Sequence, residues 1–164
     1  MSRAFVKEND EQEGKAGLVR PQSPHVNYVT PAGLHQLEEK VSQLALERSA
    51  LVGKDDLASQ QALRECERDL AYYAERVNRA VLVDPEQQPD DAVHFGAAVL
   101  AEDGEGQRWN VVIVGEDEAD AAQGRISWIS PLAKALLNAR VGDVVNWQRP
   151  AGDTELEILS IRKA

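Results

Sequence analysis

The chain has 164 residues, of which 43% are hydrophobic, and its formal net charge is −10. This length suits one domain or two small ones. Acidic residues outnumber basic ones by 28 to 18, which argues against direct nucleic-acid binding, because few cations can replace phosphate counterions. The single cysteine, Cys66, excludes an internal disulfide and a paired-cysteine metal site. Without an apolar membrane-spanning run or signal core, the sequence predicts a soluble cytoplasmic protein.

Residues 1–28 are predicted to be a flexible tail. Between Glu8 and Lys15 almost every residue is polar, and Pro21 and Pro24 follow closely. Such a composition buries too little apolar surface to offset the entropy lost on ordering.

Residues 29–84 are predicted to form an antiparallel helical hairpin, with its helices between Pro31 and Leu82. Thr30 is a suitable N-cap and Pro31 a suitable first helical residue. On both arms, apolar residues recur at alternating spacings of three and four, which is the pattern of a coiled coil. The repeating residues are Leu34, Leu37, Val41, Leu44 and Leu51 on the first arm, where Arg48 fills the one gap in the series, and Leu63, Cys66, Leu70, Tyr73, Val77 and Ala80 on the second.

The hairpin tip is predicted at Val52–Leu57. The run Gly53-Lys54-Asp55-Asp56 contains a poor helix former and two good capping residues. Because the two arms can bury each other's apolar residues, we expect a monomer.

The remainder of the chain predicts a second domain, so the fold class is α+β. Residues 85–91 form a polar, proline-containing linker after Pro85 ends the second helix. Residues 92–164 alternate between apolar and polar residues, as strands do. We expect a small antiparallel sheet with one short helix, capped by Ser130 and opened by Pro131, and we expect all three tryptophans in its core.

Several stretches resemble the bacterial transcription factors GreA and GreB. Val112–Asp120, Ile126–Ser127, Ser130–Leu137 and Val141–Val145 resemble parts of their C-terminal domain, and Tyr28–Leu34 and Ala80–Asp84 resemble the ends of their coiled coil. The resemblance covers most of residues 28–164.

This resemblance implies an FKBP-like C-terminal domain that docks on the rim of the RNA polymerase secondary channel, while the coiled coil passes down the channel. Such a protein is not an enzyme by itself, and it meets nucleic acid only through the polymerase. It needs no membrane and no stably bound cofactor. The residues at the family's docking position are Ile129, Ser130, Pro131 and Leu132.

In the family, acidic residues at the tip hold a magnesium ion at the polymerase active centre, and the polymerase then cuts backtracked RNA. Carboxylates are the hard oxygen ligands that magnesium prefers, and a second metal can activate water. The candidates here are Asp55 and Asp56, which can equally serve as helix caps.

Two departures from the family pattern leave the cleavage activity open. Ser59 stands at the position of the second tip acid, and each arm is shorter than in the family by about one heptad, which is roughly 10 Å of helix. The shortened regulator Rnk resembles this layout. The alternative function is therefore a non-cleaving channel occluder that competes with other channel factors.

Other interpretations remain open. The acidic loop Glu116–Asp120 lacks the spacing of an EF-hand calcium site, and it is either solvated or a support for the docking surface. A chaperone or isomerase that uses the FKBP-like domain, or a dimeric coiled-coil adaptor, would represent other functional classes.

Overall fold

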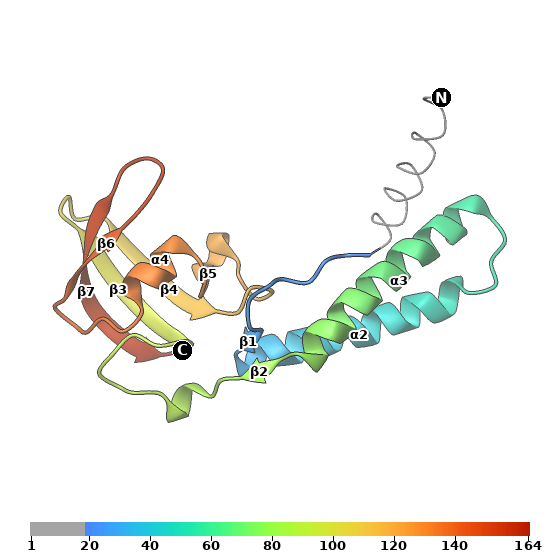
Figure 1. Ribbon diagram of the computed structural model, residues 1–164, viewed down its shortest axis with the longest axis horizontal. Coiled ribbons are helices and arrows are strands. Elements are labelled where there is room, and N and C mark those ends of the chain that lie inside the picture. Colours follow the sequence, from blue (N-terminus) through green and yellow to red (C-terminus); the bar gives the residue numbers. More distant parts are fainter. Residues whose placement is uncertain (1–18) are drawn as a thin grey trace, which may run out of the picture. The chain divides into compact units, whose positions relative to one another are not determined.

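The computed structural model describes residues 19–164, which divide into two units (Figure 1). One unit contains residues 19–26 and Gln36–Arg79, and the other contains Asn27–His35 and Ala80–Ala164. The predicted tail between residues 1 and 18 lies outside the described residues. None of the helices between residues 19 and 164 is both long and apolar enough to cross a membrane.

The predicted hairpin is confirmed as helices α2 (Pro31–Leu51) and α3 (Leu57–Asn78). Thr30 caps α2, because its Oγ1 accepts a 3.0 Å hydrogen bond from the Gly33 N–H. The predicted apolar repeat supplies the buried residues Leu37, Leu44 and Cys66. The thiol of Cys66 donates to the Leu44 carbonyl oxygen at 3.2 Å, which joins the two arms.

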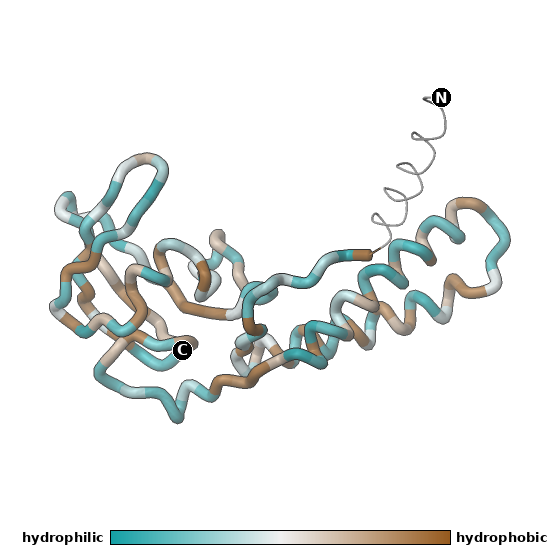
Figure 2. The backbone as a smooth tube through the Cα atoms, in the orientation of Figure 1, coloured by the Kyte–Doolittle hydropathy of each residue, from teal (hydrophilic) through white to brown (hydrophobic). Residues whose placement is uncertain are grey.

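The end of the second helix was predicted wrongly. Helix α3 ends at Asn78, and strand β2 (Val81–Leu82) pairs in parallel with strand β1 (Tyr28–Val29). The hydrophobic run through β2 is visible in Figure 2. The Val81 N–H donates to the Asn27 carbonyl at 2.8 Å, so a partner far away in the sequence outweighs continuation of the helix.

The C-terminal boundary of the predicted flexible tail was wrong, because residues 19–26 (the N-terminal segment) contact α3. The Arg20 guanidinium lies 3.8 Å from the centre of the Tyr72 ring and 3.6 Å from an Asp69 carboxylate oxygen. The Gln22 side-chain amide donates to the Tyr72 carbonyl at 3.1 Å. A cation over an aromatic face is attracted by the ring's quadrupole, which gives this polar segment a specific partner.

The second unit contains a five-stranded sheet and the short helix α4 (Pro131–Leu136). In spatial order its strands are β5 (Arg125–Ser127), β4 (Arg108–Val114), β3 (Ala97–Asp103), β7 (Thr154–Lys163) and β6 (Val144–Trp147).

The predicted sheet and helix are confirmed, with one difference in strand direction. Three neighbouring pairs are antiparallel, but β4 and β5 are parallel. The connection between them contains the 3₁₀ helix Ala121–Gln123 and brings the chain back before β5 begins.

The core of the second unit lies between the sheet and α4. Buried side chains come from alternate positions on β3, β4 and β7, as the sequence pattern predicted. Helix α4 adds Leu132, Ala133 and Leu136. The half-buried rings of Trp109 and Trp147 pack against this core. They contact each other edge to face, with 5.6 Å between the ring centroids.

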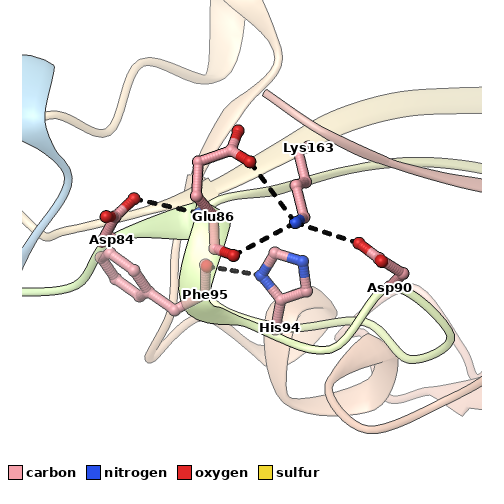
Figure 3. Close-up of polar contacts among 6 residues, drawn as sticks. All are labelled: Asp84, Glu86, Asp90, His94, Phe95 and Lys163. Atoms are coloured by element: carbon pink, nitrogen blue, oxygen red, sulfur yellow. Dashed lines mark hydrogen bonds and ion pairs between the residues drawn. The ribbon is translucent and has the colours of Figure 1, made fainter.

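Residues 85–91 are held by the last strand (Figure 3). The Lys163 ammonium lies 3.0 Å from an Asp90 carboxylate oxygen and 3.6 Å from one of Glu86, and it donates to the Glu86 carbonyl at 3.4 Å. The hydrogen bond with Asp90 is the largest cause that raises the pKa of Lys163 above its usual value. This predicted linker is therefore anchored at a specific point on β7.

Candidate functional site

The hairpin tip has the geometry of a tight reversal between two helices. The Val52 N–H still bonds the Arg48 carbonyl at 3.0 Å, as in a helix, before Gly53 takes a φ of +84°. That left-handed conformation is unfavourable for residues with a Cβ atom, and a glycine there ends α2. Helix α3 begins after Asp56.

Asp56 is the N-cap of α3. Its Oδ2 accepts a 2.9 Å hydrogen bond from the Ser59 N–H, and its backbone is extended, as N-caps usually are. The hydrogen bonds from Ser59 lower the pKa of Asp56 below its ordinary value, because they favour the charged carboxylate. The capping prediction for this residue is therefore confirmed.

The tip brings Asp55 and Asp56 together as two exposed carboxylates, with Ser59 one turn away. No group of three or more His, Cys, Asp or Glu side chains within residues 19–164 is arranged to hold a metal ion. Magnesium takes six oxygen ligands and usually only one or two carboxylates from a protein. Two carboxylates are fewer ligands than a complete magnesium site needs, so the tip by itself does not form one.

The predicted docking residues lie at the N-terminus of α4. Ser130 is its N-cap, with Oγ accepting from the Ala133 N–H at 3.3 Å, and Pro131 is exposed at the first helical position. Ile129 is half-buried, and its N–H donates to the Ser127 hydroxyl at 3.3 Å. Leu132 is only 6% exposed, so it supports this surface from the core rather than forming part of it.

A pocket with a volume of about 590 Å³ opens beside these residues. Ser130, Pro131 and Leu132 form one wall, and Trp109 and Trp147 contribute to its apolar lining. Arg149 lies at the same pocket, with its guanidinium 4.9 Å from the Trp147 ring centre. Pockets of this size and apolar character hold a small molecule or the side chains of a partner.

Sequence reasoning missed this pocket because alternating tryptophans predict a filled core. Trp109 and Trp147 do pack against the core, but both remain half-buried and border the pocket. A usable signal is their size, because a small sheet rarely buries two indoles completely.

Comparison with known proteins identifies the family. The family described as "Transcription elongation factor, GreA/GreB, C-term" matches residues 88–163. The chain is 41% identical over 151 residues to the transcription elongation factor GreB of Neisseria meningitidis serogroup A, with 82% of this chain and 93% of that protein covered. It is 35% identical over 150 residues to GreA of Acidiphilium cryptum, with 82% and 96% covered.

The chain belongs to the GreA/GreB family of transcription elongation factors. Among solved structures, it is similar to Gfh1 of Thermus thermophilus at 26% identity, with 84% of this chain and 99% of that chain covered and a TM-score of 0.41.

This GreA/GreB-family chain is shorter than its relatives within the aligned region. Because 82% of 164 residues is about 134, the 151 aligned positions include about 17 at which the Neisseria GreB has a residue and this chain has none.

Proposed function

We propose that this elongation factor binds RNA polymerase at the secondary channel, with the second unit docked on the rim and the hairpin inside the channel. It acts on the chemistry of the polymerase and contributes no enzyme activity of its own. The observation that carries the proposal is an antiparallel hairpin with two exposed tip carboxylates in a GreA/GreB-family chain. Its charge of −10 also suits a channel lined by basic residues.

The docking surface is proposed to be Ile129, Ser130 and Pro131 with the adjoining apolar pocket. An apolar side chain of the polymerase rim would fill the pocket. The capped first turn of α4 would fix where the two proteins contact each other. Pro131→Glu places a charge at this surface while keeping a residue suited to the start of a helix.

Binding to purified core polymerase tests the docking surface. We expect Pro131→Glu to weaken binding at least about tenfold, the consequence of placing an unpaired charge in an apolar contact. Val141→Glu, at another exposed apolar position of the same unit, is the matched control and should bind like the wild type. Failure of the wild-type protein to bind would refute the proposed function.

RNA length in a backtracked polymerase complex tests whether the tip promotes cleavage. Asp55 and Asp56 are the residues that would contact magnesium, which would activate the attacking water. If the tip reaches the active centre, Asp56→Ala should abolish shortening of the RNA and leave polymerase binding intact. Asp56→Asn, which keeps the helix cap, separates loss of the charge from loss of the cap.

Occlusion without cleavage is the second candidate, and three observations favour it. Ser59 stands where the resemblance to the family places the second tip acid, and its backbone N–H donates to one Asp56 oxygen. About 17 aligned positions of the Neisseria GreB have no residue in this chain. The deficit supports a shortened hairpin, and a magnesium contact near 2.1 Å tolerates no shortfall of a helical turn. An occluder should leave backtracked RNA uncut and should inhibit cleavage promoted by a full-length Gre factor.

A further inference from the structure

The acidic loop Glu116–Asp120 contacts the beginning of the hairpin through Glu118. The Thr30 hydroxyl donates to the Glu118 Oε2 at 2.6 Å, and the same hydroxyl oxygen accepts from the Gly33 N–H at 3.0 Å. Glu118, Thr30 and Gly33 all belong to the second unit, and α2 continues from there into the other unit. The carboxylate thus extends the N-cap of a 21-residue helix, where a negative charge is favourable.

Two glycines make this close approach sterically possible. A Cβ atom on Gly33 would lie 2.6 Å from the Glu118 Oε2, and one on Gly115 would clash with the Tyr28 carbonyl oxygen. Neither glycine has a positive φ, so space rather than backbone conformation is what requires a residue without a side chain. The loop and the start of α2 are therefore fitted to each other on both sides.

We infer that Glu118 is a positioning residue that fixes the first turn of α2 to the β-sheet unit through Thr30. The acidic loop thus has a structural role within its own unit, whereas its charge pattern alone indicated solvation or support of the docking surface. The remainder of α2 belongs to the hairpin, so freeing its first turn should loosen the connection between the two units. The consequence for polymerase rests on the proposed function, but the coupling within the protein does not.

The width of a spin-label distance distribution measures this coupling in the free protein. Labels are placed on Lys54→Cys at the tip and Asp153→Cys in the second unit, in a Cys66→Ser background that keeps a donor for the Leu44 carbonyl. We expect Glu118→Ala to broaden the distribution about twofold. Glu118→Gln retains an acceptor oxygen for Thr30 and should recover most of the narrow width.

Gly33→Ala gives an independent test, because its methyl group displaces the Glu118 carboxylate rather than the backbone. This variant should broaden the distribution as Glu118→Ala does, although alanine favours helix more than glycine. The double variant Gly33→Ala/Glu118→Ala should be no broader than Glu118→Ala, because the methyl group then meets no carboxylate. Such non-additivity would not arise if each change acted separately.

Glu105→Ala is the matched control, since it removes an exposed loop carboxylate of the same unit, and it should leave the width unchanged. An unchanged width in Glu118→Ala would overturn the inference, as would full additivity in the double variant. Polymerase binding is measured on the same proteins. If the wild type fails to bind, the proposed function is wrong, and the distance widths still decide the role of Glu118.

Discussion

At the scale of single residues, Asp56 caps α3 with one carboxylate oxygen, and it is also the proposed magnesium ligand. Oδ2 bonds the Ser59 N–H as the helix cap, and the side chain is otherwise exposed at the tip. Replacement by alanine therefore removes both the cap and a charge, whereas Asp56→Ser keeps a cap and removes the charge alone.

We predict that Asp56→Ala lowers the thermal unfolding midpoint of the protein by a few degrees, and that Asp56→Ser restores most of the loss. Helical circular dichroism during heating measures both effects. Asp55→Ala, which removes the neighbouring carboxylate, is the control and should change the midpoint little. Equal losses in Asp55→Ala and Asp56→Ala would contradict the capping geometry.

The stabilisation by Asp56 should also depend on pH. Its pKa is lower in the folded protein than the ordinary value of 3.8, so its charged-state contribution is complete above pH 3.8. The contribution is lost as the pH falls through the lowered folded-state pKa. The difference in stability between the wild type and Asp56→Ser should therefore narrow below pH 3.8, and a difference that grows on acidification would be inconsistent with this account.

At the scale of elements, the N-terminal segment adds contacts to a hairpin that has few buried residues of its own. We predict that Arg20→Ala destabilises the hairpin by about 0.5–1 kcal/mol, the range for an exposed cation over an aromatic ring. Arg20→Lys keeps the charge but loses the planar stack, and should recover only part of the loss. Urea unfolding followed by circular dichroism measures the effect, and an unchanged Arg20→Ala midpoint would show that the Arg20 contact contributes nothing to stability.

The anchoring of residues 85–91 by Lys163 is predicted to depend on salt. Lys163→Met should increase the rate at which a glutamate-specific protease cuts after Glu86 several-fold, because Asp90 and Glu86 lose their cation. High salt should accelerate cutting of the wild type and change the variant less, since exposed ion pairs are screened. Lys134→Met is the control at an exposed lysine. Equal rates in both variants would exclude the anchoring role.

At the scale of the whole molecule, the sequence predicted the features that depend on residues close together in the chain. The cap at Thr30, the break at Gly53 and the seam through Cys66 follow from neighbouring residues, and the structure confirms them. Alternation likewise predicted the buried faces of the sheet.

The features that sequence reasoning missed depend on partners far apart in the chain. Arg20 meets Tyr72, Tyr28 pairs with Val81, and Thr30 bonds Glu118, and no local pattern specifies such pairs. The same distinction applies to the two parts of the candidate site, the hairpin tip and the pocket beside Ser130. The tip carboxylates were found by position, whereas the pocket beside Ser130 is created by strands that meet only in the folded sheet.

Photo-crosslinking from the hairpin tip tests the central claim most directly. A photoreactive amino acid replaces Lys54, which is exposed between the two helices, and the protein is irradiated in complex with core polymerase. We predict crosslinks to the walls of the secondary channel, and their loss in the Pro131→Glu variant. Crosslinks confined to the outer surface of the polymerase, or none from a protein that binds it, would contradict the account.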